Sequence, residues 1–225
     1  MVKKTPDTKF IERNQRIQKL DRVLKKLYPK AVCALNYSNP WELTVAVILS
    51  AQCTDKTVNT VTPALFKKYP TLKHYLKAKP SEFAKDIYKT GFFNNKTKNI
   101  LAAAKKVHED FGGKVPQTME EILTLPGVAR KTANVVLGNA YGVIEGIAVD
   151  THVKRFARKF DLTDNIDPVK IERDLMELLP QKEWFPFTYR VITYSREICP
   201  ARKHDCEKHP LSKVYPKAAK NWPKP

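Results

Sequence analysis

Apolar residues recur at intervals of three and four along most of the chain, with polar residues between them. The first such stripe comprises Ile17, Leu20, Val23, Leu24 and Leu27. The same spacing predicts further helices within residues 41–49, 65–76, 100–107, 156–160, 171–179 and 191–194. No segment alternates apolar and polar residues with the period of two that a half-buried strand requires. The pattern therefore predicts an all-α protein.

A segment in the middle of the chain is predicted to form two helices joined by a tight turn. Thr118 and Glu121 have the spacing of a capping box, which starts the first helix. Pro126 discourages its continuation, and Gly127 permits backbone angles that other residues resist. The second helix ends before Gly142. Backbone amides at such a turn and helix start are well placed to bind a phosphate group.

Lys131 lies in the first turn of this second helix, where the helix dipole is positive. This position disfavours a purely structural lysine and suits an amine that reacts as a neutral nucleophile. The residues alone leave two alternatives open, a surface lysine or a lysine that only contacts phosphate.

Charge and cysteine content narrow the class of protein. Lysine and arginine number 41 against 23 aspartate and glutamate residues, and the formal charge of +18 predicts a polyanionic partner. A generic basic surface or a ribosome-like binder would carry the same excess.

The longest apolar run, residues 43–49, is too short to span a bilayer, and residues 1–13 lack the apolar core of a secretory signal. Four cysteines do not indicate a disulfide scaffold, so we expect a reducing, cytoplasmic compartment.

The sequence LPGVARKTANVVL at residues 125–137 resembles the helix-hairpin-helix of the endonuclease III family of DNA glycosylases. A VDTHV stretch that contains Asp150 follows 19 positions after Lys131, and the family pairs its hairpin lysine with such an aspartate. Further similar motifs lie at residues 50–55 and 91–96, in the family's order. The resemblance covers nearly the whole chain, and several ordered motifs make it specific.

The resemblance implies two helical lobes with a DNA-binding cleft between them. One lobe is a continuous six-helix barrel at residues 34–143 that carries the hairpin. The other lobe combines residues 1–33 with residues 144–225, which include a degenerate cluster loop. In this arrangement Lys131 and Asp150 face each other across the cleft.

The resemblance also implies a bifunctional DNA glycosylase and AP lyase of base excision repair. Such an enzyme acts as a monomer on double-stranded DNA with damaged bases or abasic sites, and its substrate class is oxidised pyrimidines. Lys131 would form a Schiff base at the sugar C1′, and proton loss from C2′ would eliminate the 3′ phosphate. Asp150 would stabilise the cationic sugar, with helix capping as the alternative role. The expected location is the bacterial cytoplasm, in association with the nucleoid.

Four further positions match family residues near the extruded base. Gln52 corresponds to a glutamine that fills the gap in the duplex, and Phe92 to an apolar wedge, with core packing as the alternative. Asp55 and His152 correspond to pocket positions, although Asp55 equally suits a helix cap and a lone histidine is more often structural. The predicted contacts with the DNA backbone are Gly127, Ala129, Arg130, Thr132, Arg202 and Lys203. Arg202 and Lys203 equally suit a solvated charged run.

Ala129 departs from the family pattern, which commonly has glycine at this position. A methyl group restricts the backbone there and bears on DNA affinity. The turn is compatible with alanine if Ala129 adopts ordinary helical angles.

Many family members bind an iron–sulfur cluster through four cysteines with the spacing C-x6-C-x2-C-x5-C. This chain has Cys199 and Cys206 at the first two positions, His209 at the third and Tyr215 at the fourth. Because a [4Fe–4S] cluster normally needs four thiolates, we expect no cluster and no cofactor. A zinc site at Cys199, Cys206 and His209 has suitable donor types but lacks a convincing fourth ligand, so a loop without metal is predicted. The other two cysteines are interpreted as small core residues.

Two other functions compete with this one. Monofunctional mismatch glycosylases of the same superfamily usually lack the hairpin lysine, and the adenine-specific ones carry an added C-terminal domain. A non-catalytic helix-hairpin-helix protein would also suit the basic charge and the lost cluster. Simple DNA binding, however, has no need of the pair formed by Lys131 and Asp150.

Overall fold

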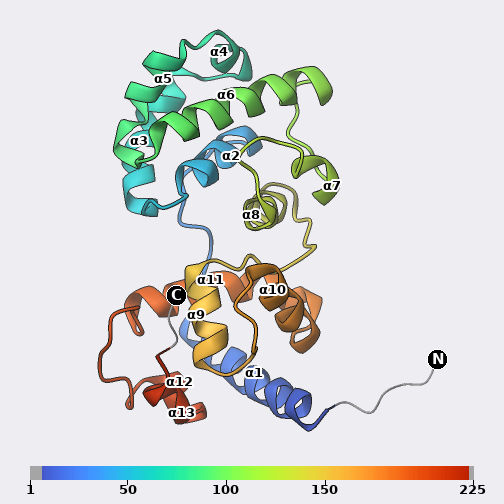
Figure 1. Cartoon of the computed structure of the whole chain (residues 1–225), viewed down its shortest axis with the longest axis vertical. Helices are drawn as coiled ribbons and strands as arrows, with labels where there is room; N and C mark the ends of the chain where they lie inside the picture. Colours follow the sequence, from blue (N-terminus) through green and yellow to red (C-terminus); the bar gives the residue numbers. More distant parts are fainter. Residues whose placement is uncertain (1–6, 223–225) are drawn as a thin grey trace, which may run out of the picture. The chain divides into compact units, whose positions relative to one another are not determined.

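The computed structural model describes residues 7–222, and every regular element in that part of the chain is helical (Figure 1). The all-α class predicted from the apolar spacing is therefore confirmed. The chain divides into two compact units. The hairpin unit is Cys33–Glu145, and the terminal unit combines Met1–Val32 with Gly146–Pro225. The boundaries predicted from the sequence were residues 34 and 143.

The hairpin unit is built around one short, apolar helix, α2. Eight residues of α2 are buried, and the helix packs against α3, α6 and α8, which explains why its sequence is apolar on all sides. Asn39 caps α2 by accepting a hydrogen bond from the Glu42 amide at 2.9 Å, and Pro40 follows as the first helical residue. The helices of this unit are α2 (Pro40–Leu49), α3 (Asp55–Lys68), α4 (Leu72–Lys77), α5 (Pro80–Asp86), the 3-10 helix η1 (Tyr88–Thr90), α6 (Phe93–Asp110), α7 (Met119–Ile122) and α8 (Arg130–Tyr141).

The terminal unit has its own apolar core. Ile17, Leu20 and Leu24 of α1 are fully buried, while Leu27 at the end of the predicted stripe is exposed. Helix α1 packs against α10, α11 and α12, and α9 packs against α10 and α11. The helices of this unit are α1 (Thr8–Leu27), α9 (Thr151–Lys159), α10 (Pro168–Leu178), α11 (Gln181–Glu197), α12 (Pro210–Val214) and α13 (Lys217–Lys220).

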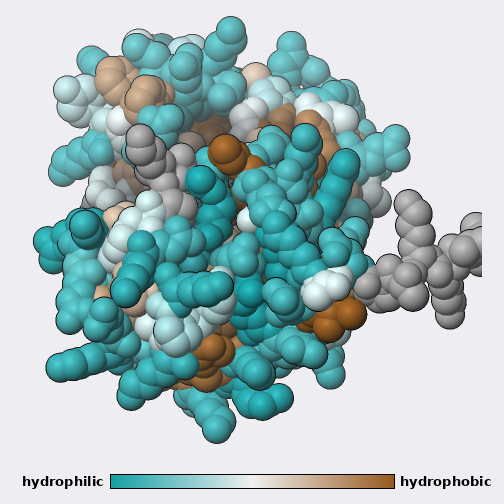
Figure 2. Space-filling model, turned by 60° about the horizontal axis from the view of Figure 1, so that its bottom comes forward, coloured by the Kyte–Doolittle hydropathy of each residue, from teal (hydrophilic) through white to brown (hydrophobic). Residues whose placement is uncertain are grey.

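The surface is largely hydrophilic on the viewed face (Figure 2), and the four cysteines differ in burial. Hydrophilic residues cover most of the face shown in Figure 2, and apolar side chains appear there in separate patches. Within residues 7–222, no helix is both long and apolar enough to cross a membrane. Cys199 and Cys206 are buried, but Cys33 and Cys53 are only partly buried and lie outside helices. The interpretation of the latter two as core residues is therefore wrong.

Candidate nucleic-acid interface

The first helix of the hairpin, α7, begins as the sequence predicts. Thr118 Oγ1 accepts a hydrogen bond from the Glu121 amide at 3.3 Å, and its hydroxyl lies 2.8 Å from Glu121 Oε2 as a donor. The cap at Thr118 is confirmed, with the glutamate bound through the hydroxyl. After α7, the Val128 amide donates to the Leu125 carbonyl oxygen at 3.1 Å. This hydrogen bond closes the turn.

Gly127 sits in this turn under two separate constraints. Its φ of +80° belongs to the left-handed region that side chains disfavour. A Cβ atom built on Gly127 would lie only 2.9 Å from Cβ of Asn99 on α6. The close approach to α6 therefore excludes a side chain even apart from the backbone angle.

Ala129 is the N-cap residue of α8 and has an extended backbone, with φ −94° and ψ 170°. Ala129 therefore does not have the helical angles considered from the sequence, but the turn still forms, because alanine adopts extended angles just as readily. The Ala129 carbonyl accepts the first helical hydrogen bond, from the Ala133 amide at 2.9 Å. A methyl group offers no capping oxygen, so the amides of the first turn of α8 need another acceptor. A phosphate group meets that need.

Lys131 is the second residue of α8 and is half-buried, as is the preceding Arg130. The predicted position of Lys131 in the first turn of this helix is therefore confirmed. The side chain of Thr132 is only 9% exposed. Burial therefore leaves little of Thr132 open to a DNA contact.

Asp150 starts helix α9 of the terminal unit. Its Oδ1 accepts a hydrogen bond from the Val153 amide at 2.8 Å, and its carbonyl accepts one from the Lys154 amide at 2.8 Å. The capping role is confirmed, and it orients the carboxylate because one of its oxygens is held by the helix. Lys131 belongs to the hairpin unit, so the two predicted catalytic groups come from different units.

Gln52 and Phe92 share an unusual backbone. Their φ angles are 51° and 48°, in the left-handed region that residues other than glycine rarely occupy. Both side chains are exposed, Phe92 by 62%. Core packing therefore does not explain Phe92, whereas the neighbouring Phe93 packs against Tyr88 with ring centroids 4.8 Å apart. Strained residues of this kind concentrate at ligand-binding sites.

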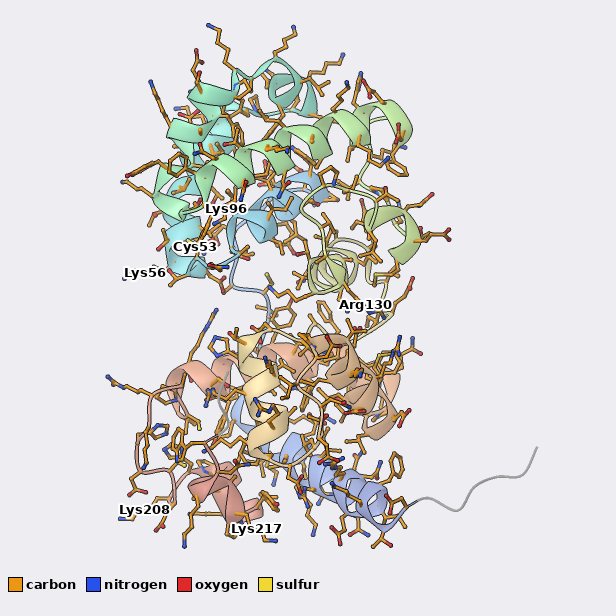
Figure 3. All side chains as sticks on the ribbon, in the orientation of Figure 1. Cys53, Lys56, Lys96, Arg130, Lys208 and Lys217 are labelled. Carbon is orange, nitrogen blue, oxygen red and sulfur yellow. The ribbon has the colours of Figure 1, made fainter. Side chains whose placement is uncertain are left out.

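Lys96 ties the two loops that carry these residues together. It is 4% exposed, and its Nζ donates to the Leu49 carbonyl at 2.8 Å and to the Thr90 carbonyl at 2.7 Å. Leu49 ends α2 just before the loop of Gln52, and Thr90 ends η1 just before Gly91 and Phe92. Burial lowers the pKa of Lys96, and Cys53, its neighbour in Figure 3, opposes this shift.

No role was assigned to Lys96 from the sequence, although its position in the apolar pattern of α6 indicated that it is buried. It lies four residues before Ile100 and so falls on the apolar face of α6. A lysine at such a position needs internal acceptors, because a buried ammonium is stable only when hydrogen-bonded.

The pocket positions are distributed over the two units. Asp55 is the first residue of α3. The N-cap of this helix is Thr54, whose side chain accepts a hydrogen bond from the Thr57 amide at 3.1 Å. The alternative of Asp55 as the cap is therefore wrong. His152 is half-buried in the first turn of α9, two residues after Asp150.

The segment after α11 carries Arg202, Lys203 and Tyr215. Tyr215, at the fourth cluster position, packs its ring 4.1 Å from the Arg16 guanidinium and lies 3.5 Å from Asp161 through its hydroxyl. Tyr215 is thus engaged in packing against α1. Arg202 and Lys203 are exposed on the loop, as a phosphate contact requires.

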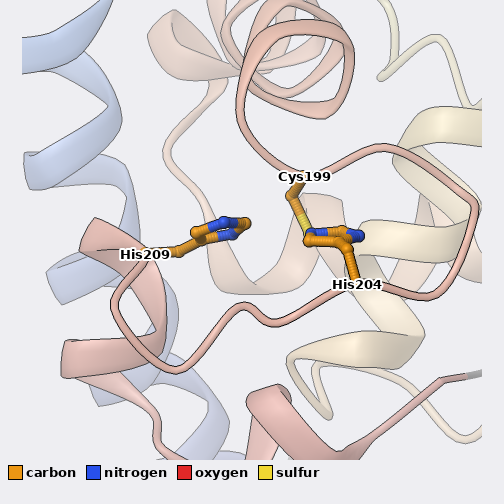
Figure 4. Close-up of side chains that lie close together, drawn as sticks. All are labelled: Cys199, His204 and His209. Carbon is orange, nitrogen blue, oxygen red and sulfur yellow. The ribbon is translucent and has the colours of Figure 1, made fainter.

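A second histidine of this loop, His204, was not identified from the sequence as a candidate metal ligand. The ligand atoms of Cys199, His204 and His209 lie within 4.8 Å of one another (Figure 4). His204 does not match a cluster position of the family, and for that reason it was not considered. Its signal was the regular spacing C-x4-H-x4-H.

Comparison with known proteins places the chain in a family. The family model described as HhH-GPD superfamily base excision DNA repair protein matches residues 45–181. Endonuclease III of Synechocystis sp. is 51% identical over 210 residues, which cover 93% of this chain and 96% of the relative. This chain belongs to the endonuclease III family.

Two solved structures of endonuclease III with DNA share its fold. One is a non-covalent complex and the other a trapped covalent intermediate. Each matches with a TM-score of 0.87 and 38% identity, and covers 92% of this chain and 97% of the other. The endonuclease III fold therefore extends over both units of this protein.

The iron–sulfur cluster of many endonuclease III proteins does not fit the donors present here. Cys199 and Cys206 are the two cysteines of the terminal unit, and Cys33 and Cys53 belong to the hairpin unit. Two thiolates are too few for a [4Fe–4S] cluster, which normally takes four.

Proposed function

We propose that this protein is a bifunctional DNA glycosylase and AP lyase that removes oxidised pyrimidines from double-stranded DNA. The observation that carries the proposal is the placement of Lys131 in the first turn of α8, directly after the turn at Gly127. Family membership supports it, because a relative with the same fold has been trapped covalently on DNA. The bacterial relative supports action in a bacterial cytoplasm, at the nucleoid.

The hairpin binds the DNA backbone in this proposal. The first-turn amides of α8 donate to a phosphate, because Ala129 supplies no competing oxygen. Gln52 enters the gap that the extruded base leaves, and Phe92 stacks against the remaining bases. The formal charge of +18 strengthens binding through release of counterions.

Lys131 performs the chemistry as a nucleophile. Its neutral amine forms a bond to C1′ while the bond from C1′ to the base breaks, and the base leaves with the electron pair and takes up a proton. Opening of the sugar ring gives the imine. A base then removes a proton from C2′, the electron pair forms a double bond, and the 3′ phosphate leaves. Water finally hydrolyses the imine and regenerates the amine.

Asp150 supports this reaction electrostatically. Its carboxylate stabilises positive charge on the sugar as the base departs. The hydrogen bond from Val153 holds the carboxylate in one orientation, so capping and catalysis use the same geometry. We assign His152 and Asp55 to contacts with the extruded base, as the family resemblance implies.

Replacing Lys131 by glutamine tests the nucleophile directly. We expect Lys131→Gln to lower nicking of an abasic duplex by more than about 10³-fold and to abolish the adduct trapped by borohydride. Binding to the duplex should change little. Lys105→Gln, which removes an exposed charge from α6, is the matched control and should nick normally. If wild-type protein binds DNA but neither releases a base nor nicks, the chain is a binding protein, and base release that survives Lys131→Gln would indicate a monofunctional glycosylase.

Two substitutions at Asp150 separate its charge from its cap. Asparagine also caps helices, so Asp150→Asn should retain stability while lowering the single-turnover rate by about 100-fold or more. Asp150→Ala should lose both properties, with a stability loss of about 1 kcal/mol. A normal rate for Asp150→Asn would limit this residue to a structural role.

A further inference from the structure

The loop between α11 and α12 brings three possible metal ligands together. The ligand atoms of Cys199, His204 and His209 lie within 4.8 Å of one another. In Figure 4 the two imidazole rings lie side by side, next to the sulfur of Cys199. A tetrahedral zinc ion, with bonds of about 2.0–2.3 Å, separates its ligand atoms by about 3.3–3.8 Å. Closure around an ion therefore needs side-chain movements of only about 1 Å.

The histidine nitrogens are arranged as metal ligands require. His204 Nδ1 lies 2.7 Å from the Arg202 carbonyl oxygen, so it donates its proton there and leaves a lone pair on Nε2. That Nε2 atom is buried and has no hydrogen-bond partner within residues 7–222. The same is true of His209 Nδ1. These two nitrogens therefore have a lone pair or proton position that is free to engage a ligand, and both belong to residues of the group of three.

Helix α9 holds the loop at Cys199. Arg155 Nη1 lies 3.9 Å from Cys199 Sγ and 3.3 Å from the Pro200 carbonyl oxygen, and its Nη2 donates to the Cys199 carbonyl. These contacts hold the backbone and the sulfur of Cys199 in place. The first ligand is therefore positioned before an ion arrives.

Cys206 supplies a second thiol in the same loop, outside the group of three ligand atoms that lie within 4.8 Å of one another. Its side chain is 1% exposed, and its Sγ makes only a weak contact, 3.6 Å long, with the Ala219 carbonyl oxygen. Two thiolates neutralise a divalent cation, so the complete site adds no net charge beside Arg155. Zinc accepts both sulfur and imidazole nitrogen.

We propose that Cys199, His204 and His209 bind one Zn²⁺ ion at the position of the family's iron–sulfur cluster, and that Cys206 of the same loop moves in as the fourth ligand. All four tetrahedral positions are then filled by protein, which is typical of a structural site. Binding releases the thiol protons and cross-links the loop. The proposal departs from the metal-free loop expected from the sequence, because His204 supplies the ligand that was lacking there.

Metal content of the wild-type protein gives the first test. Untagged protein purified without chelators should contain one zinc per chain by mass spectrometry and little iron. Exchange with Co²⁺ should produce visible bands of tetrahedral cobalt together with a thiolate-to-cobalt charge-transfer band. Stoichiometric iron with cluster absorbance would overturn the proposal, as would zinc-free protein that gives no thiolate band with Co²⁺.

Two histidine variants give the second test. His204→Ala should weaken Co²⁺ binding by more than about 100-fold, a loss larger than outer-shell changes cause. His108→Ala removes an exposed histidine from α6 and should leave Co²⁺ binding unchanged. Unaltered binding by His204→Ala contradicts the assignment. If that variant does not fold, the wild-type stoichiometry and cobalt spectrum still decide, and neither readout depends on DNA repair activity.

Discussion

The hairpin turn and the two exposed loops of the hairpin unit all contain left-handed backbone, but they place it on different kinds of residue. In the turn it falls on Gly127, where it is unstrained and where contact with Asn99 excludes a side chain. In the loops it falls on Gln52 and Phe92, where it costs about 1–2 kcal/mol each. The turn therefore depends on backbone shape, whereas the loops retain strain in order to present side chains.

The turn should respond most strongly to a side chain. Gly127→Ala combines a disfavoured φ with a clash against Asn99, so we expect it to lower the free energy of unfolding by about 2–4 kcal/mol. Urea denaturation measures the change. Ala129→Gly is the matched control in the same turn, and its effect should stay below about 1 kcal/mol because Ala129 has ordinary angles. Equal losses of unfolding free energy in the two variants would show that the backbone conformation at Gly127 does not require glycine.

Lys96 supports both strained loops, so its loss should affect stability and DNA binding together. Lys96→Met leaves the carbonyls of Leu49 and Thr90 without their donor. We expect a loss of about 1–3 kcal/mol in unfolding free energy and weaker binding to a duplex with an abasic-site analogue. Lys98→Met, at an exposed position of α6, should change neither. A stability loss with unchanged DNA affinity would mean that Lys96 does not position the loops.

Phe92 should show the smallest change in stability, and with the opposite sign. Phe92→Gly removes the strain, so we expect it to be about 1 kcal/mol more stable than Phe92→Ala, which keeps the strain. Both variants should bind the lesion duplex about tenfold more weakly, because they lose the stacking ring. Thermal unfolding and fluorescence titration provide the two measurements. If glycine and alanine give equal stability, the loop is not strained at this position.

Local chemistry explains which parts of the structure were predictable. The buried face of α1 follows directly from the spacing of Ile17, Leu20 and Leu24. The cap at Asp150 was predictable because its partner, Val153, is three residues away. Such features depend on contacts within one turn of helix, which the order of residues already specifies.

Tertiary contacts explain what the sequence did not reveal. Lys96 gains its role through the Leu49 carbonyl, 47 residues away, and His204 through a loop that folds back on Cys199. Phe92 and Phe93 are adjacent aromatic residues, and only the backbone conformation separates the exposed ring from the packed one. The family resemblance marks Phe92 as the wedge, but it assigns no role to Lys96 or His204, because their roles arise where distant segments meet.

Cys53 gives this protein a built-in reporter next to one of its strained loops. Its thiol is one peptide bond from Gln52 and partly accessible, whereas the thiols of Cys199 and Cys206 are buried. Alkylation at Cys53, read by peptide mass and so distinguished from Cys33, would footprint that loop in solution without any engineered label. Slower alkylation of Cys53 on adding damaged duplex would then show that DNA covers this loop.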